Sequence, residues 1–242
     1  MAQLIPSVEA LRDAISETDL ADESQELASL SRPAVGFEKA EAPTPSFMWG
    51  ETSVLPSDIA WPEHDGRPLE TVGVIDLASC PVGQLDVPLP SIGALLFFTQ
   101  IGNECSWSGE TGEWHRVIHV AEPGPKRHQP PGASLEAAAP RELLNVQPHL
   151  GITATAHLEA TWGSERNSEW NEAKHGASRS TPYCYVQLGG FPDPVQSDPT
   201  WGSDLILLAE FDDLVVGSWY FMIDPADLEA GRFDRTVCEW QC

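Results

Sequence analysis

The spacing HxxxH, formed by His115 and His119, is a pattern that can bind zinc when it lies on a helix, because a helix places both imidazoles on one face. The surrounding segment, GEWHRVIHV, is instead rich in β-branched residues, which favours a strand. Four residues of strand separate two side chains by about 13 Å, too far for one ion. We therefore expect two histidines on an ordinary strand surface and no metal site.

The segment CEWQC contains two further candidate ligands, Cys238 and Cys242. Such a pair can form half of a metal site or a redox couple, but no second pair of this kind accompanies it in the sequence. We expect thiols in a frayed C-terminal segment and no cofactor. The five cysteines are odd in number and scattered, which fits reduced thiols and a cytoplasmic location better than a disulfide framework.

Motifs for nucleophilic or phosphate chemistry do not occur in the sequence: GxSxG, GxGxxG and GxxxxGK[ST] are all missing. Asp212 and Asp213 are adjacent carboxylates, but neighbouring residues of a strand point to opposite faces and do not form an acid–base pair. The sequence therefore favours a protein that is not an enzyme, and it leaves the question open.

The turn GGFPDPVQSD is the element that best fits a binding role. Gly189 and Gly190 allow close approach of the backbone to a ligand, while Gln196 and Asp198 offer an amide and a carboxylate from one stiff loop. The alternative is architectural: the glycines make sharp turns, and Gln196 bonds the backbone of a related loop.

Tryptophan adds a second set of candidates, because this side chain often marks binding surfaces, although core packing alone explains most of the nine in this chain. The expected ligand- or partner-binding residues are Trp49, Gly50, Trp61, Asp76, Gly189, Gly190, Gln196, Asp198, Trp201 and Asp212.

The charge of the chain limits its partners. Against 13 Lys and Arg stand 37 Asp and Glu, a net charge of −24. Such a field repels nucleic acids and anionic membranes and attracts basic proteins, so we expect no nucleic acid and no membrane partner. A basic protein partner fits the charge, and the alternative is that the acidity only keeps the protein soluble. The oligomeric state stays open.

These candidate residues must be positioned by two kinds of segment. Residues 1–45 predict helices, with Ser7 as an N-cap and Val8, Leu11 and Ile15 at helical spacing, followed by an extended lead-in rich in proline. From residue 46 the chain has short apolar runs between Gly, Pro and Asp, which is typical of strands and turns. The expected strands are 70–76, 93–101, 114–120, 150–161, 183–188, 205–211 and 217–223. A Pro-rich stretch at 121–141, with the basic cluster Lys126, Arg127 and His128, is expected to be a mobile surface loop.

Two parts of the chain are alike. Each has a turn with glycine, an aromatic residue and proline, a strand ending in acid, and a glycine that opens an aromatic strand. We interpret residues 46–242 as an α+β domain with extensive antiparallel sheet, in which two β-rich halves, about 46–120 and 150–242, form a duplicated unit around a pseudo-twofold axis.

In order and spacing these motifs together resemble the YwqG-like family, a bacterial domain family of unknown function. The matching residues are Ser46, Gly50, Pro56, Trp61 with Pro62, residues 75–77, Gly93 with 96–98, residues 188–192, Gln196 with Asp198, residues 220–225, and 227–228 through 232–233. Departures occur at Trp49, Val74 and Val216, where the family tends to have glycine, glutamine and an acidic residue. The resemblance implies a duplicated α+β fold and implies no reaction.

Two functions follow as hypotheses. The first is a non-catalytic binding or interaction protein, in its sharpest form an immunity-type protein that neutralises a basic toxin. The alternative is a small-ligand binder or enzyme that uses a cleft between the duplicated halves, with Asp76, Gln196, Asp198 and Asp212 as its polar groups.

Overall fold

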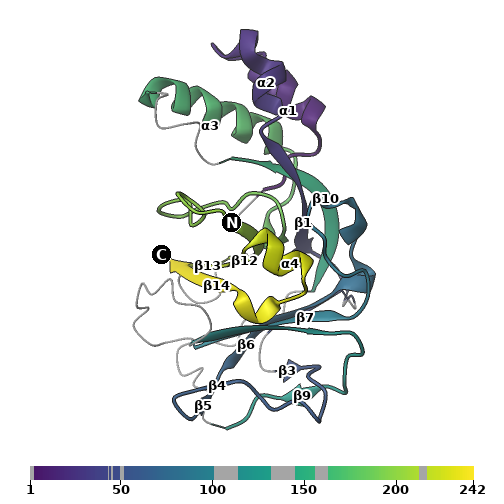
Figure 1. Ribbon diagram of the computed structural model, residues 1–242. Coiled ribbons are helices and arrows are strands. Elements are labelled where there is room, and N and C mark those ends of the chain that lie inside the picture. The colour runs from purple at the N-terminus through teal and green to yellow at the C-terminus, as the bar shows by residue number, and fades with distance from the viewer. Residues whose placement is uncertain are drawn as a thin grey trace.

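The computed structural model describes residues 3–42, 44, 46–49, 52–100, 114–131, 145–155, 163–212 and 217–242. The helices Val8–Ile15, Ser24–Ala28 and Ser164–Ser178 lie at one end of the molecule, a large sheet crosses its middle, and a second sheet with two small two-stranded sheets lies beyond it (Figure 1). The α+β class with extensive antiparallel sheet is confirmed.

The larger sheet has six antiparallel strands in the order β10-β1-β11-β12-β13-β14. Their bounds are β1 Ser31–Lys39, β10 Val146–Ala154, β11 Cys184–Leu188, β12 Ile206–Phe211, β13 Ser218–Ile223 and β14 Val237–Gln241.

The smaller sheet has four antiparallel strands in the order β2-β6-β7-β8. They are β2 Phe47–Trp49, β6 Glu70–Asp76, β7 Ala94–Thr99 and β8 His115–Val120. There are also two small antiparallel sheets of two strands each: β3 Thr52–Ser53 with β9 Arg127–His128, and β4 Glu63–His64 with β5 Arg67–Pro68.

The helices are α1 Val8–Ile15, α2 Ser24–Ala28, α3 Ser164–Ser178 and α4 Pro225–Glu229, with 3-10 turns η1 Ala21–Glu23, η2 Leu77–Ser79, η3 Val82–Gln84 and η4 Phe233–Arg235. Ser7 caps α1 as predicted, since its Oγ accepts a hydrogen bond from the amide of Ala10 at 3.2 Å. The helices form a separate apolar cluster with the end of β10. It contains Leu11 and Ile15 of α1 and Trp170 of α3, which pack with Ile152 and Ala154 of β10.

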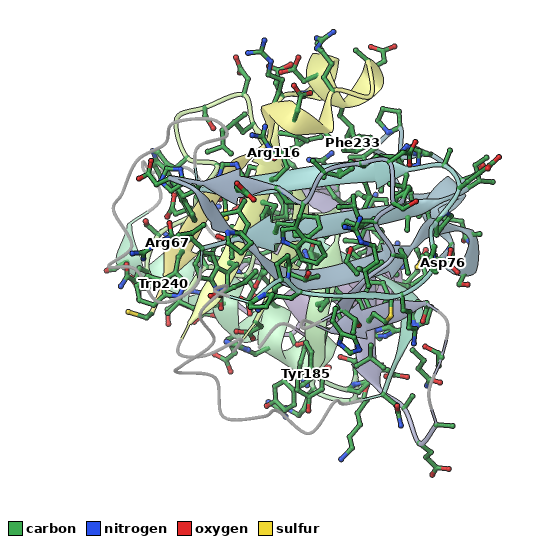
Figure 2. All side chains as sticks on the ribbon, turned by 90° about the horizontal axis from the view of Figure 1, so that it is seen from below. Arg67, Asp76, Arg116, Tyr185, Phe233 and Trp240 are labelled. Atoms are coloured by element: carbon green, nitrogen blue, oxygen red, sulfur yellow. The ribbon has the colours of Figure 1, made fainter. Side chains whose placement is uncertain are left out.

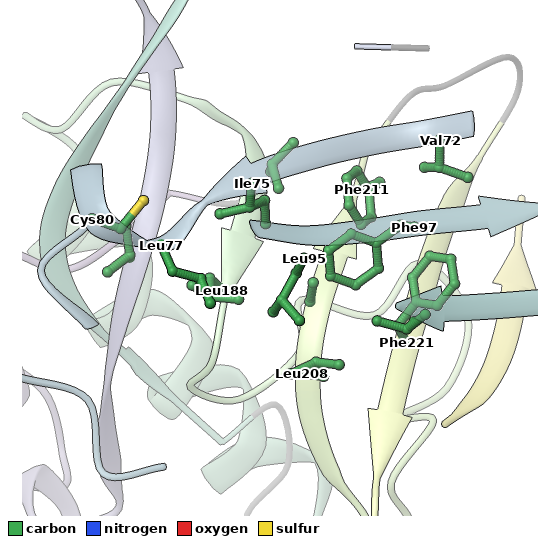
Figure 3. Close-up of a cluster of buried hydrophobic side chains, with 14 of the residues drawn as sticks. Val72, Ile75, Leu77, Cys80, Leu95, Phe97, Leu188, Leu208, Phe211 and Phe221 are labelled. Carbon is green, nitrogen blue, oxygen red and sulfur yellow. The ribbon is translucent and has the colours of Figure 1, made fainter. Parts of the chain in front are cut away.

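The main core lies between the two sheets (Figure 3). The ring of Phe97 in β7 meets those of Phe211 in β12 and Phe221 in β13, with centroids 4.9 and 5.1 Å apart and near edge-to-face geometry. Because the inward-facing side chains of both sheets meet in this layer, the space between them is filled by apolar groups.

The two sheets also share a strand order and a pattern of strand pairing. β2-β6-β7-β8 and β11-β12-β13-β14 both run antiparallel in chain order. In both, the pairing shifts at the same place: between Thr71 and Gly73 opposite β7, and between Leu207 and Ala209 opposite β13. A β-bulge is a specific structural feature of a sheet and not a defect. Its occurrence at matching positions in both sheets supports the duplication of one unit. That duplication stays a prediction.

Several elements differ from expectation. β1 forms where only an extended lead-in was predicted; it accepts Pro33 because β11 pairs with it only from Val35 onward, so no ladder bond from that side is lost. α3 was missed, because its buried face consists mainly of Trp170, Ala173 and Ala177, which is too little apolar surface for a periodic signal.

β14 was missed as well, and the frayed C-terminal segment expected from Cys238 and Cys242 is wrong: Cys238 is 2% exposed and faces the main core, whereas Cys242 is exposed. The predicted loop at 121–141 is wrong in part, because Arg127 lies in β9 and donates to the carbonyl of Pro56 at 3.0 Å. Residues 132–141 of that loop lie outside the described residues.

Candidate ligand-binding cavity

A row of polar side chains crosses the face of the six-stranded sheet that points away from the main core. Gln187 of β11 pairs with Glu210 of β12, Glu210 with Tyr220 of β13, and Tyr220 with Glu239 of β14. Their strand neighbours, such as Phe211 and Phe221, point into the main core. Because side chains alternate across a strand, the row must face outward.

The segment after β11 lies on this row. The amide of Asp193 donates to Oε2 of Glu210 at 2.9 Å, and the hydroxyl of Tyr220 donates to the carbonyl of Asp193 at 3.0 Å. Tyr220 also accepts from the amide of Val195 at 3.2 Å. The polar row therefore holds the backbone of the turn that the sequence singled out.

Gly190 lets this turn approach the neighbouring strands. It has a φ of +76°, which an L side chain rarely adopts, and a Cβ at this position would overlap Oγ1 of Thr153. The hydroxyl of Thr153 instead accepts a hydrogen bond from the amide of Phe191 at 2.7 Å. Close backbone approach, predicted for the paired glycines, thus serves contact with β10.

A cavity of about 250 Å³ opens beside this turn. Its walls come from the N-terminal segment, the end of β10, the last turns of α3, β11 and the turn itself. The lining residues are Gln3, Ile5, Thr153, Ala154, Asn171, Lys174, His175, Ser178, Tyr183, Gln187, Phe191, Pro192 and Asp193.

Lys174 supplies a positive charge to the wall. Burial lowers its pKa to about 8, and the attraction of Asp193, which lines the same cavity, opposes that shift. Its Nζ donates to the carbonyl of Thr155 at 3.3 Å and lies 5.8 Å from the centre of the Trp170 ring. At neutral pH the cavity wall therefore carries a largely buried ammonium group.

Gln187 supplies a buried acceptor. Its side-chain nitrogen donates to the carbonyls of Gly189 at 3.0 Å and Phe191 at 2.7 Å, and because a carbonyl only accepts, these bonds fix the orientation of the amide. The other end, Oε1, is buried and has no hydrogen-bond partner within the described part of the chain. A buried polar atom left in this state costs about 1–3 kcal/mol, so the site gains if a donor arrives.

Glu210, behind the turn, is 2% exposed. Burial raises its pKa well above the usual range, and the carboxylate of Asp193 adds to the effect. Burial also raises the pKa of Tyr220. The inner part of the polar row therefore favours uncharged side chains.

The predicted site residues near this turn have structural contacts of their own. Gln196 reaches the C-terminal strand, since its amide donates to Oε1 of Gln241 at 2.8 Å and its side chain to the carbonyl of Cys242 at 2.6 Å. Asp198 caps the following turn by accepting from the amide of Thr200 at 2.8 Å. Trp201 is 60% exposed.

The remaining predicted residues are spread over the molecule. Asp76 accepts from the hydroxyl of Ser79 at 2.6 Å, and it lies on the opposite side of the molecule from Trp240 of β14 (Figure 2). Trp61 is buried against Phe98 in an edge-to-face contact. These residues do not converge with Gln196 on one site.

Two further positions of the predicted set lie in the sheets. Asp212 is buried and accepts from the hydroxyl of Ser218 at 2.7 Å. Trp49 pairs with Gly73 in the smaller sheet, while Gly50 lies outside the described residues. Asp212 is not among the residues that line the cavity.

Sequence reasoning missed Thr153, Lys174 and Gln187 as site residues. A signal existed for Gln187, a polar residue within the apolar strand of β11, and for Lys174, one of only three lysines in the chain. The site depended on α3, whose existence the sequence did not indicate. Asp193 belongs to the turn that was singled out.

His115 and His119 lie on strand β8, as predicted. The expected strand surface is wrong for His115, which is buried with Nε2 2.7 Å from the carbonyl oxygen of Thr236. No group of three or more His, Cys, Asp or Glu side chains that could hold a metal ion occurs within the described ranges. Among the helices of these same ranges, none is long and apolar enough to cross a membrane.

Two antiparallel sheets around one apolar core, with a small polar cavity on the outer face of the larger sheet, define this chain as an α+β domain. Over residues 48–242 it matches the model of a domain of unknown function, DUF1963, and it belongs to that family. No curated protein matches the chain.

Proposed function

We propose that this protein is a non-catalytic binding protein that holds a small polar molecule in the cavity beside the turn at Gly190. The observation that carries the proposal is the composition of the wall: the ammonium group of Lys174, the carboxylate of Asp193 and the buried acceptor of Gln187 line one space. Polar groups that converge on a concave site are the usual mark of ligand recognition.

The size of the cavity limits the ligand. Drug-sized ligands occupy roughly 300–1,000 Å³, and the cavity here is about 250 Å³. A small metabolite fits this space. Its position on the outer face of the larger sheet differs from the cleft between halves that the sequence suggested, since apolar side chains fill that layer.

Retention of a small molecule tests the proposal. The purified protein is incubated with the low-molecular-weight fraction of host cells, separated by gel filtration and analysed by native mass spectrometry. We expect a retained mass and a raised thermal midpoint, because a ligand that binds only the folded state stabilises it. Lys174→Met should lose both effects, and Lys126→Met, which alters an exposed lysine outside the cavity, should keep them.

Equal retention by Lys174→Met with unchanged circular dichroism would place the ligand elsewhere and contradict the proposal. Loss of retention in both lysine variants would show a general effect of charge and would also count against the cavity. Comparison of the variants' thermal midpoints without ligand separates misfolding from loss of binding.

A second candidate function is the neutralisation of a basic protein, in its sharpest form as an immunity-type protein. The net charge of −24 and the 60% exposure of Trp201 favour it. Pull-down from host lysate should then recover a basic protein whose association slows steeply with added salt. Trp201→Ala should mainly speed dissociation. Recovery of no basic protein would contradict this candidate.

The closer family relationship and the cellular location of the protein are part of the same proposal. The motifs that resemble the YwqG-like family run from Ser46 to Phe233 and fall almost wholly within the matched span, which supports that closer relationship. The odd number of scattered cysteines supports a cytoplasmic location, and the family resemblance supports a bacterial source.

A further inference from the structure

We propose that the ligand of the cavity is a free α-amino acid with an apolar side chain, bound as a zwitterion between Lys174 and Asp193. This inference rests on the proposed function and names the ligand class of the same site. It follows from the signs of the charges on the wall, from the unsatisfied acceptor and from the volume.

The cavity wall carries one charge of each sign. Lys174 comes from α3 and Asp193 from the turn, so the two charged groups belong to separate elements that meet at this cavity. The ammonium of Lys174 attracts the carboxylate of a ligand, and Asp193 attracts an ammonium. A ligand with both groups on one carbon atom satisfies both walls at once.

The buried acceptor adds a donor requirement. Oε1 of Gln187 has no partner among the residues described, and the amide cannot turn round because its nitrogen already serves two carbonyls. An ammonium group has three donors. One can reach Asp193 and another Gln187, which a carboxylate or a carbonyl group cannot do.

The rest of the wall fits a short apolar side chain. Ile5, Ala154, Phe191 and Pro192 line the cavity beside the polar groups. The volume of about 250 Å³ lies below the roughly 300–1,000 Å³ of drug-sized ligands. Leucine, with about nine heavy atoms, is smaller than such ligands and suits this space.

Other small ligands fit the charges less well. A dicarboxylate brings a second negative charge toward Asp193, and a diamine brings a positive charge toward Lys174. A sugar brings no charged group toward either Lys174 or Asp193. Because the wall discriminates by sign, removing one charged group from an amino acid at a time is the most direct test.

Isothermal titration at pH 7 with three matched probes makes that test. L-Leucine carries both groups, 4-methylpentanoate lacks the ammonium, and 3-methylbutylamine lacks the carboxylate. We expect leucine to bind about 10-fold or more tightly than either analogue, since each loses one charge-assisted interaction. Lys174→Met should weaken leucine and leave the amine unchanged. Asp193→Asn should weaken leucine and leave the carboxylate unchanged.

Lys126→Met and Asp204→Asn, which alter exposed residues outside the cavity, serve as controls and should bind leucine as the wild type does. Equal binding of the three probes would overturn the zwitterion inference. Failure of all twenty amino acids, with binding of another small molecule that depends on Lys174, would overturn it too and leave the proposed function standing. Failure of the amino acids together with no retained molecule from host cells would sink both.

Discussion

At the scale of single residues, the outer face of the larger sheet combines a buried amide with a buried carboxyl group. Gln187 and Glu210 are paired across strands, and each holds part of the turn that covers them. Neither contributes to the main core, so their burial depends on that turn. A carboxyl group in such a place makes stability depend on pH.

Glu210→Gln tests this dependence. Because burial raises the pKa of Glu210, the folded protein holds the proton more tightly than the unfolded chain does. The contribution of this group to the free energy of unfolding is therefore greatest below its ordinary pKa of 4.5. This contribution falls as the pH rises toward the raised pKa of Glu210 in the folded protein. The neutral amide has no such loss and should still accept from Asp193.

We expect the stability gain of Glu210→Gln over the wild type to grow between about pH 5 and pH 8 in urea titrations. Glu229→Gln, a change of an exposed carboxylate, is the matched control and should show a flat difference. A gain that shrinks with rising pH would mean that Glu210 is ionised in the folded protein.

At the scale of elements, matching glycines open the third strand of each sheet unit. Gly93 precedes β7 with a φ of +85°, and Gly217 precedes β13 with a φ of +123°. A Cβ on Gly93 would overlap the carbonyl oxygen of Val120, and one on Gly217 that of Gln241, each at the end of the next strand. Both positions thus need glycine for conformation and for space.

Alanine at either glycine should destabilise the protein by more than about 2 kcal/mol, because backbone strain and a steric overlap add. Gly231→Ala is the matched control: its φ is +68°, but a Cβ there meets nothing within 4 Å among the described residues. It should cost only about 1 kcal/mol. Urea titration measures all three, and equal costs would contradict the steric argument.

At the scale of the whole molecule, one apolar core joins both sheets. Phe97 and Phe221 occupy corresponding positions in the two units, four residues after Gly93 and Gly217, and their rings touch. Contact between equivalent residues is expected on a twofold axis. The pseudo-twofold arrangement of two halves is supported by this contact and by the shared register, and it stays a prediction.

Because this core is shared, the two sheets should unfold together. Phe97→Ala should lower the free energy of unfolding by about 3–5 kcal/mol and leave a single transition. Urea curves followed by tryptophan fluorescence and by far-ultraviolet circular dichroism should then coincide. Two separated transitions, with only one moved by the substitution, would show that each half has an independent core.

Local patterns determined much of the fold. The apolar runs of β6, β7, β8, β11, β12 and β13 were each predicted to within about two residues, because a buried strand requires a continuous apolar run between turn residues. Ser7 also predicted the start of α1, because an N-cap residue bonds an amide within the first turn of its own helix. The glycine turn before Phe191 was also evident in the sequence.

Only the tertiary structure decided where the cavity lies. Lys174 and Gln187 become neighbours because α3 packs beside the larger sheet, and α3 buries mainly one tryptophan and two alanines, which gave no periodic signal. Asp76, Gln196 and Asp212 were grouped by residue type, yet none of the three lines the cavity. Spacing along a chain reports local geometry, whereas a binding site assembled from distant segments depends on how the elements pack.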